Sequence, residues 1–584
     1  MLISALWTLA SMTAAAAAKP NVVVIMPDDQ DKHLDSLSVM PHVSSLIGDQ
    51  GVRYDSHYCT IAWCCPSRVN LLTGKAAHNT NVTTLTMPYG GYGKFIKEGH
   101  NSNYLPLWIQ ASGAKTYYVG KFMNAYQRHN WHAPYPKGWT NSSFLVDPWT
   151  YNYWNSTWTN GDARKHLTAF PGHHTTHVTR RKALEFIDQA VDAGGQFFMM
   201  VAPVAPHAYN RHGGDRQLMP PAPPEFVGAF NNSIAPRSPN FNPDEPSGAS
   251  WILHIPKQHP KRIAHNDNFH RHRLRNLAGV DLMVQAIVQK LQDRAVLDNT
   301  YIIFTSDNGF HIGNHRLSPG KRCGFEEDIN IPLLIRGPNM PQNITSAITN
   351  SHTDIAPTIL SMMDIPLRND FDGSPIALRE PDLSSSDKNE HLGVEFWDSP
   401  KRKHGKLPHD ENGANKYYNN TYKSLRIKSG GQSFYYSVWC TGEKEFYDMN
   451  ADPYQMDNLH RTLTGPMQNL QFFDRPWHQL VPRLDALLMV LKSCKQDTCR
   501  DPYSVLFPKR EVRNLTAAMH RHYDNFFDGT PKLKFHSCHT GYIPHLEQES
   551  RVLKPYGAGS KRGLDVFGFI FLMVGWGLYW VLQF

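Results

Sequence analysis

Unbroken apolar runs alternate with amphipathic segments along the first half of the chain. Asn21–Met26 is rich in β-branched residues and predicts a strand buried on both faces. In Val178–Ala193 apolar residues recur at helical spacing, and Gly194-Gly195 follows. The same patterns predict helices at Leu105–Ala111 and Leu277–Leu291, and strands at Thr116–Val119, Phe197–Ala202 and Tyr301–Thr305. Strands that alternate with helices predict an α/β fold with a parallel sheet covered on both faces.

The pattern changes outside these elements. Between Gly213 and His272 the chain is rich in Pro, Asn and His with weak periodicity, which predicts an irregular insertion that lines a cleft. A charged, Ser-rich linker at Glu380–Glu390 separates a large domain, residues 19–379, from a smaller one, residues 391–555. The smaller domain has predicted strands at Tyr422–Lys428 and Phe434–Cys440 and a helix at Gln479–Leu491, so we expect an α+β unit.

Both ends of the chain are apolar. Leu2–Ala18 ends in alanines before Lys19-Pro20, which predicts a signal peptide over residues 1–18. Val566–Phe584 is long enough to cross a bilayer and predicts a membrane anchor or a removed GPI signal, with a buried helix as the alternative. N-x-S/T triplets predict glycosylation at Asn81, Asn141, Asn155, Asn231, Asn343, Asn419 and Asn514. We therefore expect the secretory pathway, ending at the cell surface, outside the cell, or in a lysosome or vacuole.

The composition excludes several classes of protein. Hydrophobic residues make up 41% of the chain, which is enough for large cores and argues against disorder. The net charge of +8 arises from 59 basic and 51 acidic residues that are interspersed without a long basic run. Nucleic acid is therefore not an expected partner.

Polar residues follow the predicted strands at their carboxyl ends. Asp28-Asp29 follows the first strand, Lys121 the second, His207 the third, and Asp307-Asn308 the fourth. Ligands of open α/β sheets bind beyond the carboxyl ends of strands, so we expect these four segments to converge on one site. Carboxylate and amide oxygens suit a hard cation, which favours Ca²⁺, with Mg²⁺ as the alternative. Taken alone, the two acidic pairs are also typical of a helix cap and a turn.

The segment Cys64-Cys65-Pro66-Ser67-Arg68, followed by Leu72-Thr73-Gly74, resembles the signature of the type I sulfatases. The resemblance extends from Asn21–Gln30 to Tyr447-Asp448 and Asp452-Pro453. It implies an alkaline-phosphatase-like sandwich with a large, mixed, mostly parallel sheet, plus the smaller α+β domain. The implied activity is that of an arylsulfatase-type sulfuric ester hydrolase. A buried thiol or half of a disulfide is the alternative reading of Cys64.

The resemblance also implies roles for individual residues. Cys64 would be oxidised to formylglycine by a formylglycine-generating enzyme, and the aldehyde hydrate would attack sulfur through one hydroxyl and expel sulfate through the other. Arg68 would hold this group to the metal, while Lys121, His207 and Lys321 would grip sulfate or protonate the departing alcohol. The metal ligands implied are Asp28, Asp29, Cys64, Asp307 and Asn308.

One position departs from the family pattern. Many members carry a histidine shortly after the Gly-Lys pair, where this chain has Asn124 after Gly120-Lys121. That histidine helps deprotonate the second hydroxyl, so His311 becomes the candidate base, with a loop histidine as the alternative.

Asn124, Cys64–Arg68 and the strand before Pro206-His207 resemble the branch that contains arylsulfatases and N-acetylglucosamine-6-sulfatases. A glycan 6-O-sulfatase is therefore the alternative substrate class. A phosphoester or phosphonate hydrolase is a further alternative, because a metal and cations also suit phosphate, and a non-catalytic glycan-binding protein is the last. Seven cysteines remain without Cys64, so at least one is unpaired within the chain, and Cys494 with Cys499 is a candidate local bridge.

Overall fold

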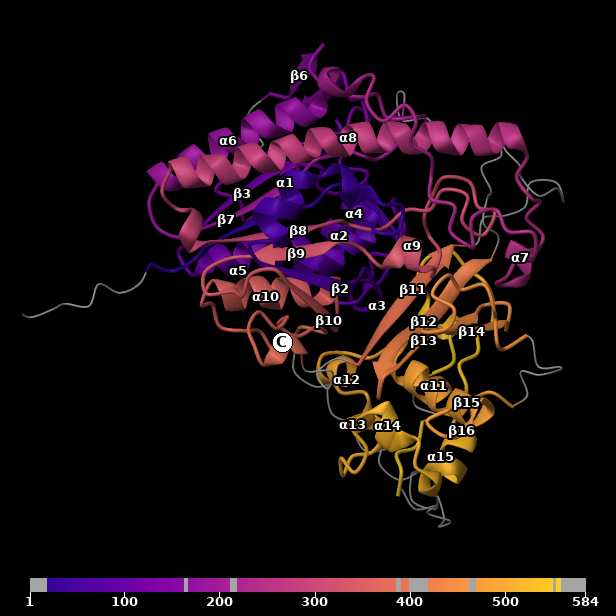
Figure 1. The fold of residues 1–584 in the computed structure, drawn as a ribbon. Helices are drawn as coiled ribbons and strands as arrows, with labels where there is room; N and C mark the ends of the chain where they lie inside the picture. Colours follow the sequence, from indigo (N-terminus) through magenta and orange to yellow (C-terminus); the bar gives the residue numbers. More distant parts are fainter. Residues whose placement is uncertain are drawn as a thin grey trace, which may run out of the picture.

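An eight-stranded sheet forms the centre of the larger domain in the computed structural model (Figure 1). The structure describes residues 18–161, 166–210, 218–384, 390–398, 419–461, 469–549 and 553–557. In spatial order the strands are β10 (Ile344–Ser351), β2 (Val52–Tyr58), β9 (Leu333–Arg336), β8 (Thr300–Thr305), β1 (Asn21–Ile25), β7 (Phe197–Ala202), β3 (Lys115–Gly120) and β4 (Asn141–Phe144). β9 runs antiparallel to both neighbours, and the other pairs are parallel. The mixed, mostly parallel sheet is confirmed.

Helices cover both faces of this sheet (Figure 1). Val23 and Ile25 of β1 belong to the core beneath α6 (Thr175–Asp192) and α8 (Pro260–Asp293). Their neighbours Val22 and Val24 belong to the opposite core, with residues of α2 (Cys64–Thr73), α5 (Leu105–Ala111) and α10 (Ile355–Met362). Alternate side chains of a strand point to opposite faces, so a strand between two helical layers must be apolar throughout.

The long helix α8 corrects one prediction. Residues from Pro260 to His272 are helical, whereas the sequence predicted that they belong to an irregular insertion. This part of α8 has a single residue, Phe269, in an apolar cluster and is otherwise held by polar contacts: Asn266 donates to Gln258, and His272 contacts the carbonyl of Pro220. Hydrophobic periodicity therefore gave no signal for it.

The smaller domain is a four-stranded antiparallel sheet packed against helix α11 (Figure 1). The strands follow chain order: β11 (His391–Asp398), β12 (Asn420–Ser429), β13 (Gln432–Trp439) and β14 (Lys444–Asp448). Leu425 and Tyr436 of the sheet share a core with residues of α11 (Trp477–Leu491). The expected α+β unit is therefore present.

The two domains meet beside the start of α2. Trp63 packs with Phe396 of β11, their ring centroids 5.2 Å apart. Nearby, His78 of the short helix α3 (Ala77–Thr80) contacts Glu395 of β11, and Glu395 also accepts a hydrogen bond from Lys423 of β12. The smaller domain thus braces the chain on either side of α2.

Two disulfides lie in the smaller domain, Cys440–Cys538 and Cys494–Cys499. The second is the bridge suggested by the sequence. Cys59, Cys64, Cys65 and Cys323 are free and buried, which agrees with the expected unpaired cysteine. The predicted signal peptide, apart from Ala18, and the predicted tail at residues 566–584 lie outside the described residues. Within the described part of the chain, no helix combines the length and the apolar character needed to cross a membrane.

Candidate active site

Cys64 is the first residue of α2 and is almost completely buried. The whole helix is buried, because it packs between the sheet and neighbouring helices. Gly74 ends it at φ 66°, and an added Cβ would lie 2.4 Å from the Phe371 ring, so the final glycine of the signature is required for both backbone and packing reasons. Ser67 donates to the carbonyl of Asp307 at 2.5 Å, which ties α2 to the end of β8.

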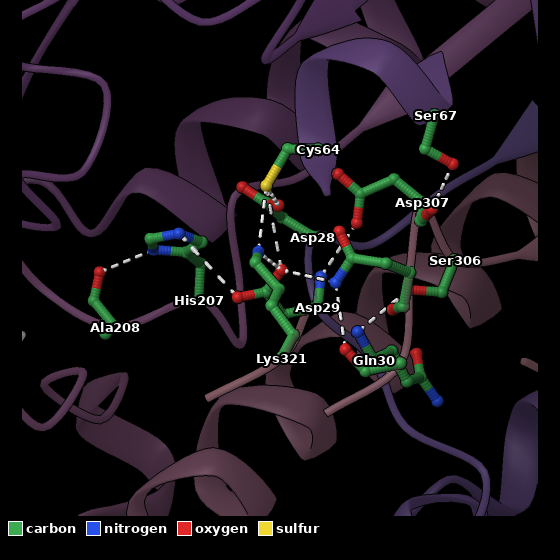
Figure 2. A network of polar contacts seen from close by, with 12 residues as sticks. Asp28, Asp29, Gln30, Cys64, Ser67, His207, Ala208, Ser306, Asp307 and Lys321 are labelled. Carbon is green, nitrogen blue, oxygen red and sulfur yellow. Dashed lines mark hydrogen bonds and ion pairs between the residues drawn. The ribbon is translucent and has the colours of Figure 1, made fainter. Parts of the chain in front are cut away.

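The acidic residues after β1 and β8 converge on Cys64 because these strands are parallel neighbours (Figure 2). The Cys64 thiol lies 3.4 Å from Asp28 Oδ1 and 3.8 Å from Asp29 Oδ1. The backbone N–H of Asp29 donates to Asp307 Oδ1 at 2.9 Å. Asp29 has φ 68°, a conformation that Asp adopts more readily than most residues.

Three cationic side chains face these three carboxylates. Lys321 Nζ contacts Asp29 and lies 2.9 Å from Cys64 Sγ (Figure 2). Lys121 Nζ donates to Asp28 Oδ2 at 2.6 Å. Arg68 Nε donates to Asp307 Oδ2 at 2.8 Å. All six side chains are buried, so the charges act on one another with little solvent screening.

The donor set fits a divalent cation. Asn308 Nδ2 donates to Asp29 Oδ1 at 2.8 Å, but the buried Oδ1 of Asn308 has no hydrogen-bond partner among the described residues. A buried acceptor without a donor is costly, and a cation would satisfy it. Together with the carboxylates of Asp28, Asp29 and Asp307, this oxygen completes a set of hard ligands.

The surrounding charges give the three carboxylates different pKa values. Burial, reinforced by the neighbouring Asp307, raises the pKa of Asp28 to about 7. Burial acts in the same direction on Asp307, yet Arg68 and Lys121 hold the pKa of Asp307 well below its usual range. Lys321 and His207 likewise lower the pKa of Asp29 against the effect of burial.

The surroundings of Cys64 disfavour the ionised form of its thiol. Burial and the negative charge of Asp28 raise the pKa of Cys64 far above neutral pH, in spite of Lys121 and Lys321. A thiol must ionise to act as a nucleophile, so an unmodified Cys64 is a poor one. The environment therefore argues against cysteine-based catalysis.

His207 presents one nitrogen to the site. Its Nδ1 donates to the carbonyl of Ala208 at 2.8 Å, so Nε2, 3.7 Å from Asp29 Oδ2, is the nitrogen that faces the carboxylates (Figure 2). Because a carbonyl only accepts, this contact fixes the tautomer of the neutral ring. Burial, together with Lys321 and Lys121, lowers the pKa of His207 to about 3 despite the opposing charge of Asp29.

His311 and Asn124 each contact a residue outside the group of carboxylates and cations around Cys64. His311 Nδ1 lies 2.7 Å from Asp328 Oδ1, in a buried group with Cys323 that is separate from the group around Cys64. Its role as a base stays a prediction. The side-chain amide of Asn124 donates to the phenol of Tyr151 at 2.8 Å.

Two residues beside the site were not predicted from the sequence. Tyr151 stacks on His207 with ring centroids 4.2 Å apart, and His352 Nδ1 lies 2.8 Å from Ser67 Oγ. Both contacts join segments far apart in the chain. His352 lies just beyond β10, and a search for polar residues at the ends of all strands would have included it.

The predicted glycosylation positions are accessible to different degrees. Asn155, Asn231, Asn343 and Asn419 are exposed, whereas Asn81, Asn141 and Asn514 are half-buried. Asn514 accepts a hydrogen bond from the backbone of Ala517 as the cap of a short helix, so its side chain has a structural role as well. Glycosylation stays a prediction at each position.

Known proteins resemble this chain over most of its length. The family described as Sulfatase matches residues 20–365. The arylsulfatase of Volvox carteri is 32% identical over 576 residues, covering 93% of this chain and 85% of the relative. The N-acetylglucosamine-6-sulfatase of Homo sapiens is 31% identical over 519 residues, covering 84% of this chain and 87% of the relative.

A solved structure shares the architecture. It is that of a protein in complex with its substrate D-glucosamine-2-N,6-O-disulfate, with a TM-score of 0.59 and 22% sequence identity, covering 76% of this chain and 94% of that chain. This likeness confirms the alkaline-phosphatase-like sandwich.

Proposed function

The chain belongs to the sulfatase family and is a sulfuric ester hydrolase, and we propose that it cleaves sulfate monoesters with a formylglycine derived from Cys64. The observation that carries this proposal is the position of Cys64. Its protonated thiol lies at the start of a buried helix among three carboxylates and three cations, where a cysteine nucleophile is disfavoured but an uncharged aldehyde hydrate is not.

The residues fit a resident calcium ion, with magnesium as the alternative. Asp28, Asp29, Asp307 and Asn308 would hold it, together with the modified Cys64. When bound, such an ion supplies Lewis acidity that lowers the pKa of a hydroxyl. The ligand set matches because every donor is an oxygen.

The cations of the site would bind the sulfate group. Lys321 Nζ already lies within hydrogen-bond distance of the Cys64 side chain, and Lys121 donates to Oδ2 of Asp28, whose Oδ1 contacts the Cys64 thiol. The charges of the three carboxylates and the three cations cancel formally, so a bound divalent ion would give the pocket a net positive charge that attracts an anionic ester. Arg68 would hold Asp307 and the start of α2 in register through its ion pair.

We assign proton donation to the leaving oxygen to His207 Nε2, because Nδ1 is committed to Ala208. A bound sulfate ester places negative charge beside the ring, which favours the protonated form. Lys321 is a second donor within reach of the same centre. His311 is kept as the proposed base for the last step on the strength of the sequence alone; its contact with Asp328 belongs to a group separate from the one around Cys64.

The substrate is proposed to be an aryl sulfate, in line with the arylsulfatase relative. A glycan 6-O-sulfate is the second candidate, because a relative named N-acetylglucosamine-6-sulfatase aligns over 84% of the chain. Phosphate or phosphonate esters are the third, since oxygen ligands and lysines suit them too.

Maturation would take place in the secretory pathway, through a formylglycine-generating enzyme. Two disulfides favour an oxidising compartment, and the exposed N-x-S/T triplets fit glycosylation there. The final location would be the cell surface through residues 566–584, the extracellular space, or a lysosome or vacuole.

The test begins with the mass of the peptide that contains Cys64, from protein made in a host with the maturation enzyme. We expect the mass in which oxygen replaces SH and H. Cys64→Ala should abolish hydrolysis of aryl sulfates, whereas Cys65→Ala, at the adjacent buried thiol, should retain it. An intact thiol in active protein would refute the mechanism, and a strong preference for aryl phosphate over aryl sulfate would refute the substrate class.

A further inference from the structure

One aromatic ring touches two of the site's nitrogen-bearing side chains. Tyr151 lies between β4 and β5 (Asn155–Trp158), and its ring stacks on the imidazole of His207 at 4.2 Å between centroids and 27° between planes. Lys121 Nζ lies 5.0 Å from the centroid of the same ring. A cation at this distance from a tyrosine ring is attracted to it, and stacking restricts rotation of the imidazole.

The ring is itself held in place. Asn124 donates to its phenol oxygen at 2.8 Å, and Asn124 is over nine-tenths buried. The Oδ1 of Asn124 has no hydrogen-bond partner in the structure, so the contact with Tyr151 is the one hydrogen bond found for this amide among the described residues. The residue that replaces the family's histidine therefore fixes a tyrosine.

The backbone around His207 is tied to the same segment. Tyr153, two residues after Tyr151, donates its hydroxyl to the carbonyl of His207 at 2.6 Å. With Nδ1 bonded to Ala208, the imidazole is constrained at its backbone, at one nitrogen and on one face. The nitrogen left for the substrate is Nε2.

We propose that Tyr151 is a positioning residue that aims His207 Nε2 at the leaving oxygen of the sulfate ester, and that Asn124 holds Tyr151 in that position. The proposal rests on the proposed function, because it requires a leaving oxygen that accepts a hydrogen bond from His207. It also gives Asn124 a role away from the nucleophile.

Leaving groups of different basicity provide the test. 4-Nitrophenolate departs with little need for a proton, whereas phenolate and alkoxides need one. For Tyr151→Ala, we expect kcat/KM to fall about 100-fold with phenyl sulfate and less than about 5-fold with 4-nitrophenyl sulfate, since general acid catalysis contributes 10²–10⁴-fold. Tyr151→Phe keeps the ring but loses the hydrogen bond from Asn124, so it should show only a small shift in the ratio, equal to that of Asn124→Ala.

Two further variants separate positioning from folding. Trp149→Ala removes another half-buried ring from the same segment and should not change the ratio between the two substrates. Asn124→Ala should shift the ratio in the same direction as Tyr151→Ala, but less. When Asn124→Ala is combined with Tyr151→Phe, we expect no further loss, because both changes remove the same hydrogen bond between Asn124 and Tyr151.

The outcomes distinguish the two proposals. Equal losses with both substrates, or a Tyr151→Phe variant as impaired as Tyr151→Ala, would overturn the positioning role while leaving the sulfatase mechanism intact. An unchanged ratio in Asn124→Ala would overturn the part assigned to Asn124. A wild-type protein with converted Cys64 that cleaves neither of these esters nor a glycan 6-O-sulfate would overturn both proposals.

Discussion

Replacing Glu395 by glutamine would remove one negative charge from the junction of the two domains and keep the shape of the side chain. Glu395 accepts hydrogen bonds from the backbone N–H of His78 at 2.9 Å and from Lys423 Nζ at 2.7 Å, and its carboxylate lies 2.8 Å from His78 Nδ1. The variant leaves the buried Lys423 with Glu547, 3.7 Å away, as its nearest remaining carboxylate in the described residues.

The size of the effect follows from the acidity of Glu395. Burial raises its pKa, but the charges of His78 and Lys423 and their hydrogen bonds dominate and lower the pKa of Glu395 to about 2. The gap from the ordinary value of 4.5, at about 1.4 kcal/mol for each pH unit, corresponds to about 3 kcal/mol of stability. Breaking one partner of a buried pair costs a similar amount, about 3–5 kcal/mol.

The sign of the pH dependence is fixed by the direction of this shift. Because the folded pKa is depressed, the stabilisation is complete above pH 4.5 and disappears as the pH falls towards 2. We therefore expect Glu395→Gln to lower the free energy of unfolding by about 3 kcal/mol at pH 7, and by progressively less below pH 4.5.

Urea unfolding followed by tryptophan fluorescence at neutral pH and near pH 3 would measure this difference. Glu185→Gln is the control, since Glu185 forms an exposed pair with Arg181 and should change stability little at either pH. A loss for Glu395→Gln that is the same at both pH values would refute the electrostatic reasoning and indicate lost packing instead.

Three other results are expected. Asp307→Asn should weaken calcium binding more than about 100-fold by calorimetry, because loss of an outer-shell partner alone costs 10–100-fold; unchanged binding would remove Asp307 from the ligand set. Chelation with EDTA should abolish sulfate ester hydrolysis and added Ca²⁺ should restore it, so full activity after chelation would contradict a metal requirement. Gly74→Ala should lower the melting temperature more than Gly194→Ala, because both have φ near 66° but only at Gly74 would a Cβ meet Phe371; equal losses would show that packing is not the cause.

The sequence predicted the four central strands of the sheet, β8, β1, β7 and β3, because burial on both faces gives an unbroken apolar run. It did not predict β2, β4, β9 or β10. Phe197–Ala202 was predicted to the residue, since each of its side chains enters one of the two cores. The first part of α8 was missed for the opposite reason. Arg273, near its middle, is buried yet pairs with Asp31 and the carbonyl of Asp29, so a polar residue there supports the site rather than marking a loop.

For the site, position at a strand end was sufficient to find the residues that follow β1, β3, β7 and β8. It was not sufficient for Tyr151, which lies in a connection between strands and reaches His207 across 56 positions of sequence. Contacts of this kind depend on how loops fold over the sheet, and no local pattern records them. The same holds for Asn124, whose partner is visible only in three dimensions.

Because α2 is buried, the activity of the protein would depend on whether Cys64 is modified before the chain folds. Cys64 is 1% exposed and every other residue of its helix is buried, so a folded chain offers a modifying enzyme no access to the thiol. On the proposed mechanism, oxidation of Cys64 to the aldehyde would therefore compete with folding, and the faster process would decide whether a molecule becomes active. A chain that folds before the oxidation would keep its thiol and remain inactive. The specific activity of a preparation would then depend on the fraction of molecules modified during synthesis as well as on the rate of the catalysed reaction.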